Sequence, residues 1–215
     1  WRGALAAAQA ACDRGYQELK AQDHSFARAL LDFSQAVVLL AQQRSAEAAE
    51  LLRTTLELCR VHEVMTMQPA VLAHLSGALA QSGRVDQALA LLEPAIAQHN
   101  SRAGGRYNEY YFPYFLAVAL HHAGRADDAV AAARQACDAA ASFEEVGHQA
   151  RALRLLARLQ ALAGRDLDAA AHLAESQALA RQCDMHWPTL EAACEVTLEA
   201  PASPRGHRLA REDHA

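Results

Sequence analysis

Apolar residues recur three and four positions apart along most of the chain, with polar residues filling the positions between them. This spacing is typical of helices that bury one face. Residues that interrupt helices are few, with 10 Gly and 6 Pro in 215 residues, and Ala and Leu dominate. The pattern predicts an all-α protein with helices over 2–20, 25–42, 45–62, 66–82, 85–99, 108–123, 126–142, 146–163, 166–183 and 187–199.

A repeat of about forty residues underlies this pattern. Gly-Arg pairs occur at Gly83-Arg84, Gly124-Arg125 and Gly164-Arg165, and Gln43-Arg44 takes the same place one period earlier, so the intervals are 40, 41 and 40 residues. A glycine at the end of a helix adopts the left-handed conformation that satisfies the last carbonyl groups. We therefore expect each pair to mark the turn between two helices of a hairpin.

Other positions of the repeat are small or apolar. An alanine follows five residues after the turn position, a packing residue follows four later, and a small residue precedes that alanine by twelve. These positions are Ala48, Ala88, Ala129 and Ala169; Leu52, Leu92, Ala133 and Leu173; and Ala36, Ser76, Ala117 and Ala157. Small residues on both sides of a turn let two helices approach closely, and a hairpin with one apolar face must stack on its neighbours. The sequence therefore predicts an α-solenoid.

The small residue, the glycine at the turn and the alanine five later resemble the tetratricopeptide repeat (TPR), stretched beyond its usual length of about 34 residues. The resemblance extends to about Ala200 and implies a right-handed superhelix of about four to five hairpins. The chain departs from the TPR pattern in lacking the large aromatic residue early in the first helix and the proline that often closes the second.

This register divides the chain into a single repeat domain, 1–200, and a polar tail, 201–215. Within the domain we expect a truncated repeat over 1–20, hairpins over 25–62, 66–99, 108–142 and 146–183, and a capping helix over 187–199. Because the chain begins within a helical pattern and without Met, we interpret it as a piece of a longer polypeptide.

Two segments, EVGHQARALRLLARL and QCDMHWPTLEAA, carry a narrower resemblance. They are similar to the C-terminal TPR region of bacterial signalling proteins that combine a class III adenylate/guanylate cyclase domain with an AAA/STAND ATPase. Maltose-regulator-like transcription activators have the same kind of tail. The resemblance implies a cytoplasmic module that binds a protein or peptide, or another domain of its own parent chain.

Composition narrows the classes of partner. The net charge of −5 supplies no overall attraction for nucleic acid, and the apolar runs fall short of the roughly 20 residues that a membrane span needs. The five cysteines are widely spaced and form no CxxC pair, which indicates reduced thiols in the cytosol.

The segment YNEYYFPYFL holds six of the 12 aromatic residues of the chain. The repeat register predicts that Tyr111, Tyr114 and His121 face a binding groove on the first helices, while Phe112 and Phe115 pack against neighbouring helices. Tyrosine suits a binding surface because it offers a large contact area with a polar tip. The alternative is that the whole cluster fills extra core space around Pro113.

The next hairpin places three arginines on one helical stripe, at Arg151, Arg154 and Arg158. Beside the tyrosines they would form a cationic and aromatic channel for an acidic peptide or for phosphate. The alternative is a solvated face paired with Glu144, Glu145 or Asp168. The Asn and Lys residues with which TPR grooves clamp a C-terminal carboxylate are missing from these positions.

The equivalent stripe in the first complete hairpin is apolar: Leu30, Phe33, Val37 and Leu40. An exposed stripe of this kind would form an interface with a preceding domain or a second copy. It supports an alternative function, in which the chain is a structural or oligomerisation element of a parent cyclase or STAND ATPase.

Motifs for catalysis, metal binding and cofactors are missing from the sequence. It has no HExxH, no Cys/His spacing suited to zinc, no GxSxG and no phosphate-binding loop, and Cys137 has no evident base partner. We therefore predict a non-catalytic interaction module without a metal or cofactor.

Overall fold

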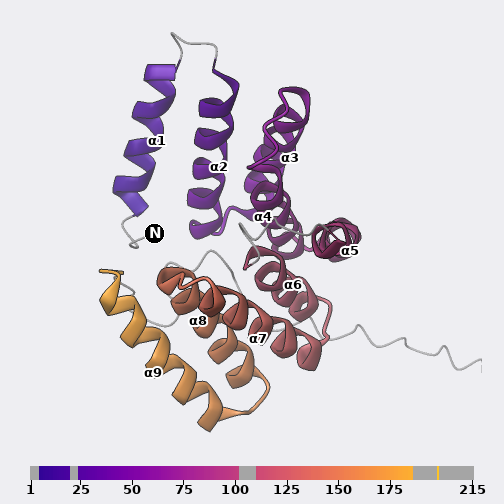
Figure 1. The fold of residues 1–215 in the computed structure, drawn as a ribbon, viewed down its shortest axis with the longest axis vertical. Helices are drawn as coiled ribbons and strands as arrows, with labels where there is room; N and C mark the ends of the chain where they lie inside the picture. Colours follow the sequence, from indigo (N-terminus) through magenta and orange to yellow (C-terminus); the bar gives the residue numbers. More distant parts are fainter. Residues whose placement is uncertain (1–4, 20–23, 102–109, 186–197, 199–215) are drawn as a thin grey trace, which may run out of the picture.

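The protein forms a stack of antiparallel helices, described here from a computed structural model. The structure describes residues 5–19, 24–101, 110–185 and 198, and within them it contains nine helices and no strand (Figure 1). The helices are α1 (Leu5–Leu19), α2 (Ser25–Ala41), α3 (Ser45–Val61), α4 (Gln68–Gln81), α5 (Val85–Ser101), α6 (Tyr111–His122), α7 (Ala126–Ser142), α8 (Val146–Leu162) and α9 (Asp166–Gln182). The predicted all-α solenoid of helical hairpins is confirmed.

The turns between helices share one backbone geometry. Gly83, Gly124 and Gly164 have φ of +82°, +74° and +71°, and Gln43 takes the same left-handed conformation at φ +62° without being glycine. In the last of these turns the amide of Gly164 donates to the carbonyl of Ala161 and that of Arg165 to Gln160, at 3.0 and 2.9 Å. This pair of hydrogen bonds forms the Schellman motif, which satisfies backbone carbonyl groups that have no partner within the helix at its C-terminal end.

Left-handed residues also occur in the turns that join one hairpin to the next. Glu63, Glu144 and Asp184 have φ of +56°, +55° and +54°. Among the described residues the left-handed positions thus recur about every twenty residues from Gln43 to Gly83 and again from Gly124 to Asp184, which is once per helix in these two parts of the chain rather than once per hairpin. The sequence pattern revealed only the alternate turns because these three positions hold acidic residues instead of glycine.

The core consists of the small and apolar positions of the repeat. Ala48, Ala88 and Ala129 are fully buried, as are Ala36, Ser76 and Ala117 on the partner helices. The fourth hairpin departs from this burial pattern, because Leu173, the counterpart of the fully buried Leu52 and Leu92, is only half-buried. Alanine at these contacts removes side-chain bulk, so that the two helices of each hairpin lie close together.

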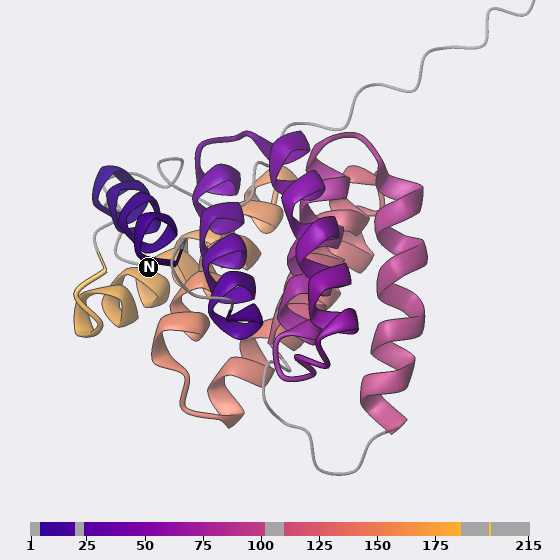
Figure 2. The ribbon, with the colours of Figure 1, turned by 90° about the horizontal axis from the view of Figure 1, so that it is seen from above.

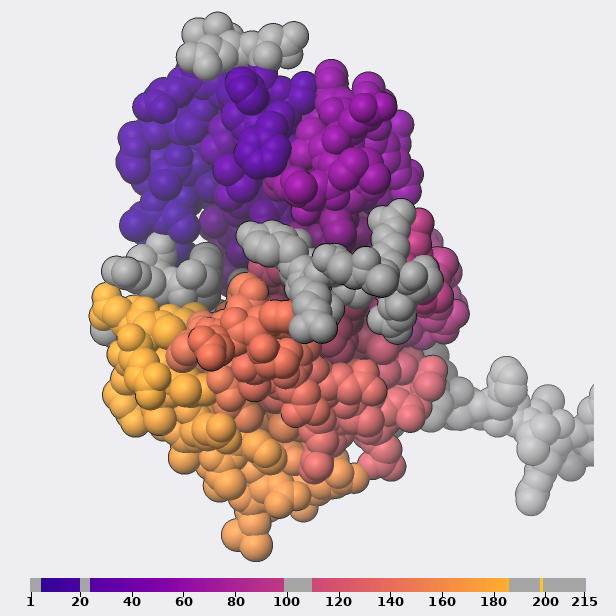
Figure 3. Space-filling view, in the orientation of Figure 1, coloured from indigo at the N-terminus to yellow at the C-terminus, as the bar shows by residue number. Residues whose placement is uncertain are grey.

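Each helix packs on the next along the chain, and α4 also packs extensively on α6. Gly77 allows this second contact, since a Cβ atom at its position would overlap the ring of Phe115. Helix α5 lies at the outer edge of the array, as Figures 1 and 2 show from two directions. The space-filling view places the first half of the chain above the second half (Figure 3).

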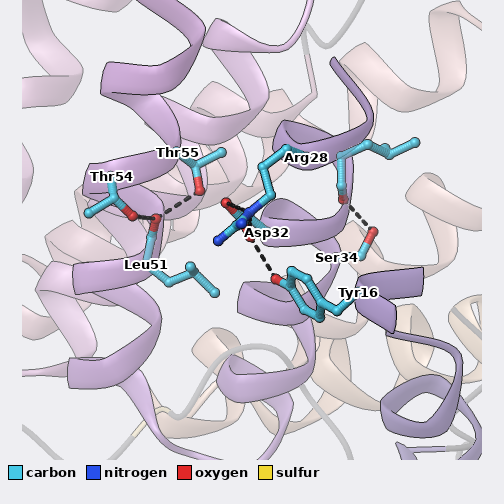
Figure 4. Close-up of polar contacts among 8 residues, drawn as sticks. Tyr16, Arg28, Asp32, Ser34, Leu51, Thr54 and Thr55 are labelled. Carbon is cyan, nitrogen blue, oxygen red and sulfur yellow. Dashed lines mark hydrogen bonds and ion pairs between the residues drawn. The ribbon is translucent and has the colours of Figure 1, made fainter. Parts of the chain in front are cut away.

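Helix α1 contacts α2 and no other described helix. The hydroxyl of Tyr16 donates to Oδ1 of Asp32 on α2 at 2.7 Å, and within α2 Nε of Arg28 donates to the same carboxylate at 2.9 Å (Figure 4). Gln9 and Gln35 exchange side-chain hydrogen bonds of 2.9 and 3.1 Å. Cys12 is the buried residue of this helix and Gly15 lies against the side chain of Leu31, so α1 is attached to α2 by hydrogen bonds together with apolar contact.

Most helix ends agree with those expected from the sequence. For α2 to α5 and α7 to α9 the ends lie within two residues of the predicted ones. The predicted capping helix over 187–199 and the tail over 201–215 lie outside the described residues, except for Leu198, which packs against the main core. No helix in the described part of the chain combines the length and apolarity needed to cross a membrane.

Candidate functional site

Four aromatic side chains form a continuous row across the first helices of the four hairpins. We call Phe33, His74, Tyr111 and His148 the aromatic row; they lie on α2, α4, α6 and α8. Successive ring centroids are 4.7, 4.8 and 5.3 Å apart, and the rings meet mainly edge to face. Such contacts are favourable between aromatic rings, so the row joins the four hairpins side by side.

His74 lies at the centre of this row and is almost fully buried. Its Nδ1 lies 2.7 Å from the carbonyl oxygen of Ala70, and its ring also touches that of Phe115 at 4.5 Å. Burial lowers the pKa of His74 to about 3. His74 is therefore a neutral ring at pH 7, with Nδ1 as its hydrogen-bond donor.

His148 ends the row at the surface. Its ring stacks on Tyr110 with centroids 4.7 Å apart and planes 9° apart. Nδ1 of His148 lies 3.0 Å from Oε2 of Glu145, and Nε2 lies 3.4 Å from the hydroxyl of Tyr111. Burial lowers the pKa of His148 while the bond to Glu145 raises it, and burial is the larger effect. At neutral pH the ring therefore donates through Nδ1 to the carboxylate and accepts through Nε2.

An open pocket of about 370 Å³ lies beside His148, at the start of α8 and the end of α9. We call it the α8 pocket; it is lined by Glu145, Val146, Gly147, His148, Arg151, Cys183 and Met185. The guanidinium carbon of Arg151 lies 5.8 Å from the ring centroid of Tyr114, a cation–π distance. The pocket thus combines one cation, one carboxylate, one imidazole and apolar walls.

The predicted groove residues divide into two groups. Tyr111, Arg151 and Arg158 are half-buried, and the first two contact or line the site around His148. Tyr114 and Arg154 are only 2% and 3% exposed, and His121 is also buried. The prediction that these three side chains face an open groove is therefore wrong.

The error has a physical cause in the packing of α6. Because α4 carries Gly77 where α6 crosses it, Phe115 fits against the backbone of α4 and draws α6 close. Tyr114 is then enclosed among Tyr110, Phe115 and Arg151. The register of a single repeat does not contain this contact between neighbouring hairpins.

The apolar stripe of the first hairpin is likewise only partly exposed. Leu30 is 48% exposed, Phe33 and Val37 are half-buried, and Leu40 is 0% exposed. Leu40 belongs to the core, so the expectation that it lies on an interface is wrong. Phe33 packs on His74, which leaves Leu30 as the open end of the stripe.

Several residues of the site were not singled out from the sequence. Neither His148 nor His74 was identified as a candidate, and both are among the eleven histidines of the chain. A usable signal exists for the first: Glu145 and His148 are three residues apart at the start of a helix, a spacing that lets their side chains meet. Cys183 and Met185 reach the pocket through the turn after α9, which local spacing does not reveal.

In the described ranges no three His, Cys, Asp or Glu side chains gather in a group that could hold a metal ion. Burial, with Asp138 and Glu175 nearby, raises the pKa of the Cys137 thiol to about 12, so this thiol stays protonated at neutral pH. The α8 pocket therefore remains the strongest candidate site, and its chemistry is suited to binding.

Comparison with known proteins supports the fold. A solved Podosopora anserina structure, described as a kinesin light chain with nearly identical TPR-like repeats, superposes with a TM-score of 0.51. The fold is TPR-like. The alignment covers 82% of this chain and 88% of that one at 20% sequence identity, so the similarity extends to the TPR-like architecture and not to a shared partner. No protein-family model and no curated protein matches the sequence.

Proposed function

We propose that this TPR-like chain is a non-catalytic interaction module that binds a peptide or a helix of a protein partner. The observation that carries the proposal is the α8 pocket, which lies at the surface end of the aromatic row. Aromatic rings and arginine are the side chains that most often dominate binding energy at interfaces. Here they surround an opening large enough for one side chain of a ligand.

The row supports this proposal in a second way. Tyr110, Tyr111 and His148 hold one another through ring contacts, and Glu145 fixes the His148 ring through a hydrogen bond. A binding surface that is already rigid loses less side-chain entropy when its partner binds. The pocket thus has the fixed shape that selective binding requires.

The same proposal includes the setting of the module. We infer a cytoplasmic bacterial signalling or regulatory protein, in which the partner is a separate protein or another domain of the parent chain. The resemblance of EVGHQARALRLLARL and QCDMHWPTLEAA to the TPR tails of such proteins supports this setting. The first of these segments contains Glu145, His148 and Arg151 of the pocket.

A library of random twelve-residue peptides displayed on phage tests the binding function. We expect the chain to enrich a family of related peptides, and Arg151→Gln and Tyr111→Ala to reduce their binding at least about tenfold, as expected for central interface residues. Arg60→Gln is a matched control, because Arg60 is exposed on α3 and its nearest carboxylate is that of Glu57 at 3.8 Å. Enrichment of no peptide family, or equal binding to all variants, would contradict the proposal.

One observation favours a second function, assembly through the first hairpin. Phe26 and Leu30 lie one turn apart on α2 and are 46% and 48% exposed. We propose that a homodimer would form through this pair as the structural element of a larger protein. Sedimentation over a range of concentrations should then show a dimer that Leu30→Glu converts to a monomer. A wild-type monomer at every concentration rules this function out.

A further inference from the structure

We propose that the α8 pocket recognises an acidic side chain of the peptide, and that His148 takes up a proton when this side chain binds. The inference rests on the proposed peptide-binding function and adds the chemical class of the ligand and its dependence on pH. It follows from the charges that surround His148 and from the hydrogen bonds of its two ring nitrogens.

Among the described residues that line the pocket, Arg151 is the one permanent cation and Glu145 the one carboxylate. With a neutral His148 the charges of these two lining residues cancel each other. The carboxylate of Glu145 is already engaged by Nδ1 of His148 at 3.0 Å. The guanidinium of Arg151 lines the pocket beside the face of Tyr114, so it supplies the positive charge that attracts a ligand carboxylate.

An acidic ligand changes the charge balance around His148. Once a second carboxylate enters, the pocket holds two negative charges and one positive charge, and protonation of His148 restores neutrality. Protonation also turns Nε2 from an acceptor into a donor, which gives the ligand a further hydrogen bond. Binding and proton uptake therefore favour one another, and each must strengthen the other to the same extent.

We do not expect the side chains that face His148 from other helices to take up the proton in its place. Tyr110, which precedes α6, stacks on its ring, and Tyr111, the first residue of α6, places a hydroxyl near Nε2. His74 on α4 reaches it only through Tyr111 and is neutral at pH 7, while Cys183 lines the pocket from the end of α9. Burial lowers the pKa of His148 and its bond to Glu145 raises it, so a new charge beside the ring changes its protonation directly.

The direction of the effect follows from the two states of His148. In the empty pocket its pKa is below the ordinary value, so it is neutral at pH 7.5. A bound carboxylate raises that pKa, so affinity should increase as the pH falls through the range between the two values. The limit for one proton is tenfold per pH unit, and we expect about three- to tenfold between pH 7.5 and 5.5. A basic or apolar ligand would show the reverse dependence or none.

The peptides enriched from the twelve-residue library provide the probes. The tightest-binding acidic peptide is synthesised together with its counterpart in which Glu or Asp is replaced by Gln or Asn. Calorimetry at pH 5.5 and 7.5, in two buffers of different ionisation enthalpy, gives the affinity and the number of protons taken up. We expect the acidic peptide to bind at least about tenfold more tightly than its amide counterpart at pH 5.5, with up to one proton taken up.

Three variants separate the roles of the pocket residues. Arg151→Gln should remove the preference for the acidic peptide, and His148→Gln should keep that preference but remove the proton uptake and the pH dependence. Glu145→Gln should tighten binding of the acidic peptide at pH 7.5, since it removes the opposing charge; a purely structural role of Glu145 would weaken it. His62→Gln, at an exposed histidine beyond α3, is the matched control.

The outcomes distinguish this inference from the proposed function. Enrichment of peptides without acidic residues, equal binding of the amide counterpart, or proton uptake that survives His148→Gln would overturn the inference and leave peptide binding intact. Enrichment of no peptide at all would overturn both. Circular dichroism spectra and unfolding temperatures of each variant show whether it retains the fold.

Discussion

Gln43 occupies a turn position that glycine fills in the three later hairpins. Its φ of +62° brings the Cβ atom close to the backbone, a strain that costs a non-glycine residue about 1 kcal/mol. Nothing lies within 4 Å of the position a Cβ would take at Gly83, Gly124 or Gly164, so the comparison involves backbone strain alone.

We therefore expect Gln43→Gly to raise the free energy of unfolding by about 0.5–1 kcal/mol. The converse change, Gly124→Ala, should lower it by about 1 kcal/mol. Urea unfolding followed by circular dichroism measures both. Gln43→Ala is the control, because alanine retains the strained Cβ and should bring no gain. An equal gain from alanine and glycine would mean that the glutamine side chain, not the backbone, is the source.

Gly77 should be sensitive to the smallest enlargement. An added Cβ would overlap the ring of Phe115, which is fully buried and has no free space to enter. Gly77→Ala should lower the free energy of unfolding by about 1–2 kcal/mol, since overpacking outweighs the gain in helix propensity. In a double variant that combines Gly77→Ala with Phe115→Leu, the smaller leucine side chain should relieve the overlap. Gly147→Ala is the control, because its nearest neighbour is Sδ of Met185 at an ordinary 3.7 Å.

At the scale of helices, the sequence predicts where each helix ends, but it does not predict which side chains of a helix are buried against its neighbours. Gly83, Gly124 and Gly164 fix where a helix stops through their own backbone geometry, which is a local property. The facing of Tyr114 depends on the contact between Gly77 and Phe115, which are 38 positions apart in the sequence. A periodic pattern assigns the same face to equivalent positions, so it misses a contact that occurs in one pair of hairpins only.

The attachment of α1 is a separate case, because side-chain hydrogen bonds to α2 add to its apolar contact. Tyr16→Phe removes the hydroxyl that donates to Asp32 and leaves a buried carboxylate with one partner fewer. We expect α1 to open more easily by about 1 kcal/mol while α3 is unaffected. Hydrogen exchange of residues 5–19 and 45–61 measures the two helices separately.

Ser34→Ala is the matched control for this change. Its hydroxyl donates to the carbonyl of Leu30 within α2 and does not reach α1 (Figure 4). Faster exchange in α1 after Ser34→Ala, or equal acceleration in α3 after Tyr16→Phe, would contradict the idea that α1 is held by these hydrogen bonds.

At the scale of the whole molecule, the aromatic row runs through all four hairpins, and the buried His74 lies at its centre. His74 is neutral in the folded state, with a pKa of about 3, and titrates near 6.5 when unfolded. The unfolded chain therefore binds more protons below pH 6.5, so the stabilising effect is complete above that value and is lost as the pH falls towards 3. The slope cannot exceed about 1.4 kcal/mol per pH unit for one group.

Between pH 6.5 and 5.0 we expect His74 to account for a loss of about 1–2 kcal/mol in the free energy of unfolding. Urea unfolding at several pH values, compared between wild type and His74→Phe, isolates this contribution as a difference in slope. His74→Gln provides a second comparison if phenylalanine disturbs the packing. Identical slopes in all three proteins would mean that His74 does not control acid sensitivity.

The overall architecture could be derived from the sequence, whereas the site could be derived only in part. The forty-residue period predicts stacked hairpins because each position recurs often enough to be recognised. Tyr111 and Arg151 were identified as candidate binding residues, but the pocket also needs Met185 from the turn after α9 and His148 at the end of the row. Those residues occur once each, so no periodicity marks them.

The twenty-residue spacing of the left-handed turns, described from Gln43 to Gly83 and from Gly124 to Asp184, has a consequence for how chains of this type can change in length. Insertion of one twenty-residue unit would preserve every turn, yet each later helix would exchange its role as first or second member of a hairpin. His148 would then leave the line that Phe33, His74 and Tyr111 define. Insertion or loss of forty residues preserves both the turns and the row. Homologous chains should therefore differ in length by whole hairpins, even though a single helix is the smaller unit that the backbone repeats.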